Sequence, residues 1–110
     1  MSYFFLQKEI NMSNFKSYKY NESVVDAVLM SVTNQTDIIN SLGDAAAAGL
    51  LAKLNLSYNA TTRTYDCTFR YKNDSTDQSV TNNVFLVKYN SGQFGAVSAD
   101  DFLANYTEIA

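Results

Sequence analysis

The sequence SLGDAAAAGLLAKL, residues 41–54, decides how the chain is interpreted, because four consecutive alanines precede a pair of leucines. Such a segment could cross a membrane, line a pore or form a helix in a packed core. It is too short for a membrane helix, which needs roughly 18 apolar residues, and Asp44 and Lys53 interrupt it. Core packing is the interpretation we favour, and a helix lining a pore or an oligomer seam is the alternative.

Helical periodicity extends on both sides of the alanines. Asn34 and Asp37 have the spacing of an N-cap and its acidic partner. Five apolar residues share about a third of the helical circumference. They are Ile39, Leu42, Ala46, Leu50 and Leu54. The neighbouring face, with Ala45, Ala48 and Ala52, presents only methyl groups, which would let another backbone approach closely. We therefore predict a buried helix that continues through Leu54.

A second helix is predicted immediately upstream, where apolar residues recur at helical spacing. They are Val24, Val25, Val28, Leu29 and Val32. Asn21 or Ser23 could cap this helix, the latter together with Asp26. The many valines leave a strand as the alternative, because β-branched side chains favour strands.

The second half of the chain changes to the period of a strand. Tyr65, Cys67, Phe69 and Tyr71 alternate with polar residues, which predicts a strand with one apolar face. A turn at 73–79 and a strand at 79–89 should follow, and its apolar run at 84–87 indicates a central position.

Two further strands and a terminal helix complete the prediction. Residues 54–58 form a strand that precedes the alternating one, and residues 90–97 form a glycine-containing loop with a short fourth strand. Ser98 caps the last helix with Asp101 at the third position, and Phe102, Leu103 and Tyr106 would anchor it.

These elements predict an α+β fold. It has an N-terminal arm at residues 1–20 and a single domain at residues 21–110. The domain contains two N-terminal helices, a three- to four-stranded antiparallel sheet and a short C-terminal helix.

Composition excludes several kinds of site. With no His and a single Cys, the chain has neither an internal disulfide nor a Cys-cluster zinc site, and it lacks the usual general base. Cys67 is interpreted as a buried small residue rather than a nucleophile. The oxygen-rich residues 73–77 are interpreted as a solvated turn rather than a calcium loop. We expect no enzyme activity, no metal and no cofactor.

Charge and the N-terminal sequence indicate the kind of partner. A net charge of −3 argues against nucleic acid as a partner of the domain. The arm differs, because residues 1–20 carry three lysines and one glutamate, a net charge of +2. Its aromatic and apolar side chains could stack bases, but we favour a protein interface, where such residues are anchors. The predicted partner-binding residues are Tyr3, Phe4, Phe5, Leu6, Phe15, Tyr18 and Tyr20.

The expected function is that of a non-enzymatic structural or interaction protein. The chain is rich in Asn, Ser, Thr and Tyr and has no Pro or Trp, a composition that resembles small accessory components of phage particles, although no motif carries the resemblance. We predict a capsid-decorating or connector-associated virion subunit that docks other protein subunits through its arm, in an oligomer or assembly. The apolar run at 3–6 is too short for a signal peptide, so a cytoplasm-like compartment of synthesis is expected, with no membrane partner.

Two alternatives come from other functional classes. The acidic domain could inhibit a host protein by imitating nucleic acid, which requires its charges to cluster on one surface. A small-ligand-binding or enzymatic domain with a cone-shaped α+β fold would require a deep apolar pocket with convergent polar groups.

Overall fold

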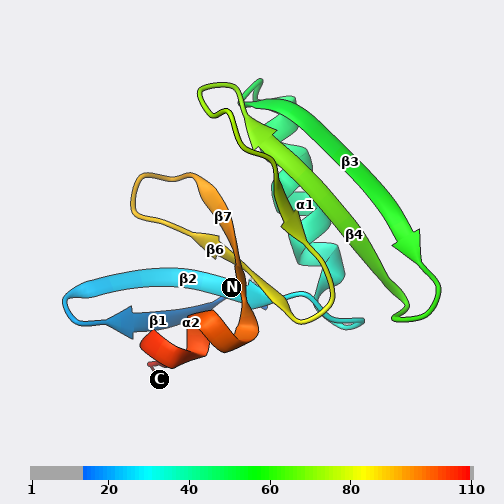
Figure 1. Ribbon diagram of the computed structural model, residues 1–110. Coiled ribbons are helices and arrows are strands. Elements are labelled where there is room, and N and C mark those ends of the chain that lie inside the picture. The colour runs from blue at the N-terminus through cyan, green and yellow to red at the C-terminus, as the bar shows by residue number, and fades with distance from the viewer. Residues whose placement is uncertain (1–13, 110) are drawn as a thin grey trace, which may run out of the picture.

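The computed structural model describes residues 14–109, which are mostly β, with two antiparallel sheets and two helices (Figure 1). The five-stranded sheet has the order β7-β6-β2-β1-β8 and contains β1 (Lys16–Tyr20), β2 (Ser23–Leu29), β6 (Val84–Lys88), β7 (Phe94–Ser98) and β8 (Thr107–Glu108). The three-stranded sheet has the order β3-β4-β5 and contains β3 (Leu51–Asn59), β4 (Thr64–Tyr71) and β5 (Gln78–Val80). The helices are α1 (Gln35–Ala47) and α2 (Ala99–Asn105). The predicted α+β arrangement is therefore wrong.

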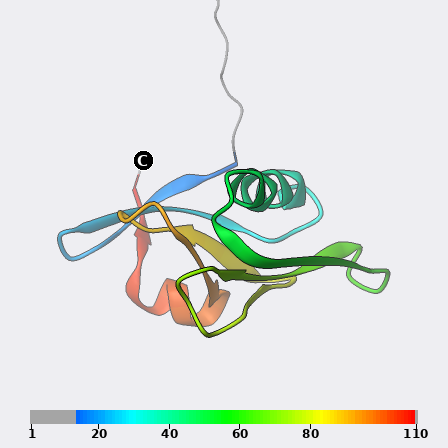
Figure 2. The same cartoon turned by 90° about the horizontal axis from the view of Figure 1, so that it is seen from above.

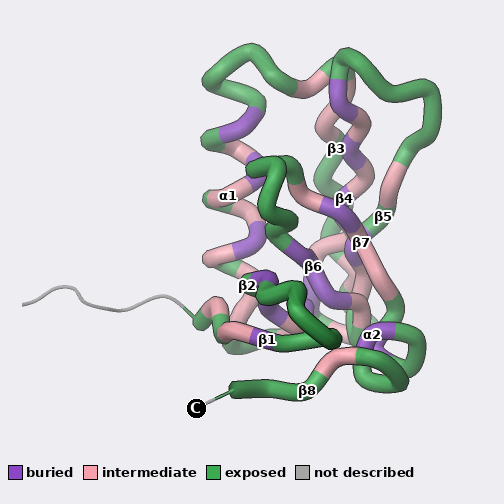
Figure 3. The backbone as a smooth tube through the Cα atoms, turned by 90° about the vertical axis from the view of Figure 1, so that its left-hand side faces the viewer, coloured by how far each residue is buried: buried purple, intermediate pink, exposed green. Residues whose placement is uncertain are grey.

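Each helix packs on a different sheet, and the two helices lie on opposite sides of the molecule (Figure 2). One cluster of buried residues lies between α1, the three-stranded sheet and one face of the five-stranded sheet, and Figure 3 marks the buried positions along these elements. It consists of Val28, Met30, Ile38, Leu42, Cys67, Phe69, Tyr71, Val80 and Leu86. The second cluster lies between α2 and the opposite face of the five-stranded sheet, and consists of Tyr18, Val25, Ala27, Phe85, Val87, Ala99 and Phe102. The five-stranded sheet is thus covered on both faces.

The predicted first helix is wrong, because Ser23–Leu29 forms strand β2 between β1 and β6. Val25 and Ala27 are buried toward α2, whereas Val28 is buried toward α1. A strand buried on both faces loses the period-2 pattern, so its apolar residues also fitted a helical face. The valines favoured the strand.

The predicted second helix is correct in its first part but ends earlier, at Ala47. Gly49 adopts φ +78°, and its N–H donates to the Ala46 carbonyl at 3.0 Å, while the Leu50 N–H donates to the Ala45 carbonyl at 3.0 Å. This pair of bonds is a Schellman motif, which ends helices at a glycine. The chain then enters β3, so Leu50 and Leu54 are not helical, contrary to the prediction.

The buried face of α1 also differs from the predicted one. Ile38, Leu42 and Ala45 are buried, whereas Ala46 is exposed. The Gln35 side chain joins the start of the helix to β4, because its Oε1 accepts the Tyr65 N–H at 3.1 Å. These contacts hold α1 along the three-stranded sheet.

The strand predicted from alternation is confirmed as β4, in which Cys67, Phe69 and Tyr71 are buried. The strand before it is also confirmed, within β3. The strand predicted at 79–89 is divided, because a turn with Asn83 at φ 69° separates β5 from β6, and these belong to different sheets. The central position predicted for 84–87 is confirmed, since β6 lies between β2 and β7.

The chain does not end in a helix as predicted. Ser98 caps α2, and its Oγ accepts the Asp101 N–H at 3.3 Å. Phe102 is buried, but Leu103 is 57% exposed and does not anchor the helix. After α2 the chain forms β8, which pairs with β1 and was not predicted.

Candidate functional site

The structure places the predicted partner-binding residues in different environments. Tyr3, Phe4, Phe5 and Leu6 lie outside the described residues. Tyr18 is 7% exposed, and its ring lies 5.0 Å from the Phe102 ring, so it belongs to the core under α2. Phe15 is half-buried, with its ring 6.4 Å from that of Phe94. Tyr20 is exposed beside Tyr106, at 5.5 Å between ring centres. Residues 16–20 of the predicted arm are thus a strand of the sheet.

The sequence candidates for catalytic chemistry do not form a reactive centre in the described part of the chain. Burial raises the pKa of the Cys67 thiol to about 11, and the nearby Asp66 carboxylate acts in the same direction. A thiol with that pKa stays protonated at neutral pH and is a poor nucleophile. Within residues 14–109, no three His, Cys, Asp or Glu side chains gather as metal ligands would.

A surface hollow of about 470 Å³ lies beside the end of α1. Its lining includes Leu50, which precedes β3, Tyr71 and Lys72 at and after the end of β4, and Gly92 and Gln93 from the β6–β7 turn. Lys72 and Tyr71 are its only titratable side chains. Neither a carboxylate nor a cysteine is among the residues that line the hollow, and the Tyr71 hydroxyl already accepts the Phe94 N–H at 2.8 Å.

The edge of the five-stranded sheet at β7 is closed by side chains of the other sheet. The Phe94 N–H donates to the Tyr71 hydroxyl at 2.8 Å. The Ala96 N–H donates to Oε1 of Gln78, also at 2.8 Å. Tyr71 ends β4 and Gln78 begins β5, so these bonds also hold the two sheets together. They satisfy outward-facing donors that an edge strand would otherwise leave unpaired.

Strand β3 forms an open edge of the three-stranded sheet. It pairs with β4 on one side, and no strand within residues 14–109 lies on the other (Figure 1). Among residues 14–109, β4 is the one element that hydrogen-bonds to the backbone of residues 52–58. A strand in this position presents alternate N–H and C=O groups that a further strand can bind.

Apolar side chains lie beside this edge, on the face of the sheet that carries α1. Leu54, Leu56 and Tyr58 share that face with their cross-strand partners on β4, Phe69, Cys67 and Tyr65. The helix and the core bury Phe69 and Cys67 completely, yet Leu56 is 44% and Tyr58 54% exposed. The cover that α1 provides therefore stops short of the second half of β3.

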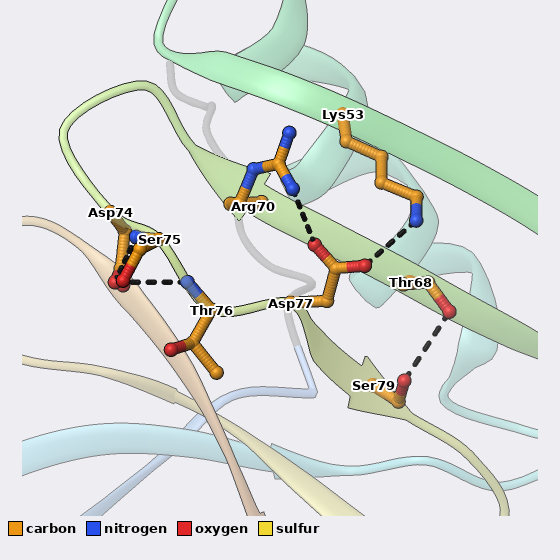
Figure 4. A network of polar contacts seen from close by, with 8 residues as sticks. All are labelled: Lys53, Thr68, Arg70, Asp74, Ser75, Thr76, Asp77 and Ser79. Atoms are coloured by element: carbon orange, nitrogen blue, oxygen red, sulfur yellow. Dashed lines mark hydrogen bonds and ion pairs between the residues drawn. The ribbon is translucent and has the colours of Figure 1, made fainter.

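The opposite face of the three-stranded sheet is polar (Figure 4). Asp77 binds both Lys53, at 2.7 Å, and Arg70, at 3.1 Å. The hydrogen bond from Lys53 holds the pKa of the Asp77 carboxyl below its usual range, and Arg70 acts in the same direction. Lys53 is the single charged residue of β3, and this ion pair holds its ammonium on the polar face.

We define the β3 edge as the backbone of Leu51–Asn59 together with the side chains of Leu54, Leu56 and Tyr58. Edge strands are commonly protected by charged side chains, by proline or by a bulge. The β3 edge has one lysine, no proline, and a register shift only at its start, between Leu51 and Lys53. It is the candidate functional site, and the sequence analysis missed it because the start of β3 was assigned to the helix.

Comparisons of the chain with protein-family models, with curated proteins and with solved structures found no match. No helix within residues 14–109 has the length and apolar character needed to cross a membrane.

Proposed function

We propose that this chain is a non-enzymatic structural subunit that joins other protein subunits by adding a strand to the β3 edge. The observation that carries the proposal is a nine-residue strand with one edge that no strand within residues 14–109 pairs, flanked by the half-exposed Leu56 and Tyr58. Strand addition is a common mode of protein recognition, in which backbone hydrogen bonds give affinity and alternate side chains give specificity.

The free energies expected from apolar burial and hydrogen bonding at the β3 edge are large enough for an interface. Leu56 and Tyr58 each have about half of their surface left to bury, so each contributes on the order of 1 kcal/mol when a partner covers it. The N–H and C=O groups along β3 would exchange hydrogen bonds with water for bonds with the partner strand, each worth roughly 1 kcal/mol net. Of the outer strands of the two sheets, β7 is closed by Tyr71 and Gln78, and β5 and β8 have only 3 and 2 residues, which leaves β3 as the long open edge within residues 14–109.

The assembly we propose is a phage particle, in which the chain decorates the capsid or attaches beside the connector. The composition resembles that of small accessory phage components, and the sparse charge, 17% of residues, suits a subunit held mainly by backbone and apolar contacts. Tyr3, Phe4, Phe5 and Leu6 are proposed as a second contact, made by the N-terminal residues. Such a subunit would be synthesised in a cytoplasm-like compartment and then incorporated.

No specific observation favours the two other functional classes. Several carboxylates of the acidic domain are already engaged within the protein, since Asp77 binds two cations, Asp26 accepts from Ser17 and Asp37 accepts from the Asn14 N–H. A cone-shaped ligand-binding domain requires helices that cover a single curved sheet. The two-sheet fold lacks that arrangement within residues 14–109.

The proposal is tested by co-expressing the full chain with the proteins encoded beside it and measuring co-sedimentation. Leu56→Lys should abolish incorporation, because it places a charge where the partner strand would lie. Leu103→Lys is the matched control, since Leu103 is 57% exposed on α2, which packs on the other sheet, and it should incorporate normally.

Two results would overturn the proposal. One is a chain that stays monomeric and joins no assembly. The other is normal incorporation of Leu56→Lys together with loss of incorporation when residues 1–13 are deleted, which would assign docking to the N-terminal residues alone.

A further inference from the structure

We infer that the first occupant of the β3 edge is the β3 strand of a second copy of this chain, bound antiparallel about a two-fold axis at Asn55. This inference rests on the proposed function, because it names the partner of the same site. The pairing would join two three-stranded sheets into one continuous six-stranded sheet. A two-fold interface of this kind uses the same surface on both subunits and is complete with two copies.

The register follows from the length of the edge. Two antiparallel copies of Leu51–Asn59 overlap completely only when Asn55 faces Asn55, so that Lys53 faces Ser57 of the second copy. On the α1 side, the same register places Leu54 opposite Leu56 at two symmetric positions. Cross-strand apolar pairs of this kind are a main source of sheet stability.

The side chains near the ends of the pairing are also compatible in size. Ala52, where the register of β3 with β4 shifts, would lie near Tyr58 of the second copy, and the small alanine leaves space for the ring. Tyr58 already packs edge-on against Tyr65, at 5.2 Å between ring centres, which fixes its position within its own hairpin. Because α1 leaves Leu56 and Tyr58 about half-exposed, this side of β3 has room for the second strand.

Charges on the polar face are complementary in this register. Arg70 and Lys53 of one copy would lie in a row with Ser57 and Asp66 of the other, because Lys53 pairs with Arg70 and Ser57 pairs with Asp66 within each copy. Lys53 and the second copy's Asp66 would be two strand spacings apart, about 10 Å, close enough for weak attraction between flexible side chains. No two like charges face each other across the pair of strands, because Lys53 is the single charge on each.

The sharpest test uses Asn55→Cys in the full-length protein. Facing Cα atoms in an antiparallel pair are about 4.5 to 5.5 Å apart, within the range that a disulfide spans. Under mild oxidation, most of the Asn55→Cys protein should become a disulfide-linked dimer. The native Cys67 does not compete, because it is fully buried and, at a pKa of about 11, stays protonated.

Ser57→Cys is the matched control for register. In the proposed pairing, the two copies of residue 57 are offset by four positions along the strands, roughly 14 Å, which no disulfide can bridge. Ser57→Cys should therefore remain monomeric on non-reducing gels. Equal cross-linking of Ser57→Cys and Asn55→Cys would overturn the register, because it indicates random collision.

Sedimentation of the protein without an introduced cysteine provides the second measurement. Leu56→Lys should weaken the dimer by about tenfold or more, the effect of losing an apolar pair at two symmetric positions, whereas Leu103→Lys should leave it unchanged. A chain that sediments as a monomer at all concentrations, with no Asn55→Cys dimer, overturns the inference. If the β3 amides then become protected in a complex with a different subunit, the proposed function stands and only the second copy is excluded.

Discussion

The outer strands β7 and β3, one from each sheet, differ in whether their outward-facing backbone groups are hydrogen-bonded. At β7, the outward N–H groups of Phe94 and Ala96 are bound by Tyr71 and Gln78 of the other sheet. At β3, the backbone groups of residues 52–58 that point away from β4 have no partner within residues 14–109, and Leu56 and Tyr58 lie half-exposed beside them. The fold can therefore close an edge with ordinary side chains, which makes the open edge a feature that calls for a functional explanation.

The largest loss of stability is expected when a buried side chain of α1, which covers the three-stranded sheet, is truncated. Leu42→Ala should cost roughly 2 to 5 kcal/mol of unfolding free energy, because Leu42 is fully buried and the substitution leaves a cavity. Leu50→Ala is the comparison, since Leu50 is 51% exposed and the change should stay within about 0.5 kcal/mol. Urea unfolding measures both, and equal losses would contradict the end of α1 at Ala47.

A smaller effect is expected at the closed edge. Tyr71→Phe removes the hydroxyl that accepts the Phe94 N–H and should cost about 1 to 3 kcal/mol, because it leaves a partly buried donor unpaired. Tyr58→Phe removes the corresponding hydroxyl beside the open edge and should leave the stability of the monomer unchanged, since Tyr58 is 54% exposed. If thermal melting shows the two variants to be equally stable, Tyr71 does not close the β7 edge.

Substitution of Gly49, which lies between α1 and β3, should change the free energy of unfolding by about 1 kcal/mol. Gly49→Ala is destabilising because Gly49 adopts φ +78°, which an alanine reaches only with strain. Gly43→Ala should have the opposite sign, since Gly43 lies within α1 with open space around its Cα and alanine favours a helix by about 1 kcal/mol. Chemical denaturation measures both variants. If Gly49→Ala were stabilising and Gly43→Ala destabilising, the assigned end of the helix would be wrong.

The smallest effect is expected on the polar face of the three-stranded sheet. Asp77→Asn should lower stability slightly at neutral pH, because it removes the partner of Lys53 and Arg70. Folding lowers the pKa of Asp77, so this stabilisation is present above the usual carboxyl range and is lost as the pH falls through the folded-state value. The difference between the variant and the natural chain should vanish at low pH and shrink in high salt. A difference that is constant across pH would show that the carboxylate charge is not its cause.

The pattern of apolar and polar residues along the sequence correctly predicted elements that have one buried and one exposed face. Strand β4 was predicted because Cys67 and Phe69 alternate with polar residues, and the cap at Ser98 depends only on its near neighbours. Strand β2 was missed because burial on both faces removes that alternation. The helix was extended too far because Leu50 and Leu54 continue its apolar period by coincidence, although Gly49 is the residue type that ends helices.

The candidate site was beyond sequence reasoning for a different reason. Whether a strand lies at an edge depends on pairing between distant residues, and the closure of β7 by Tyr71 joins positions 23 residues apart. The aromatic pattern around Tyr18 was interpreted as a protein interface, but α2, from the other end of the chain, covers that ring. Only the folded arrangement shows which apolar groups stay accessible.

Amide hydrogen exchange of the dilute full-length chain, resolved by NMR, tests the contrast between the two edges most directly. Alternate amides of residues 52–58, those that point away from β4, should exchange nearly as fast as unprotected backbone. The amides of Phe94 and Ala96 should exchange slowly, because Tyr71 and Gln78 bind them. Raising the protein concentration should protect the β3 amides and leave those of Phe94 and Ala96 unchanged. Fast exchange at Phe94 and Ala96, or slow exchange along all of β3 in the dilute monomer, would contradict the account.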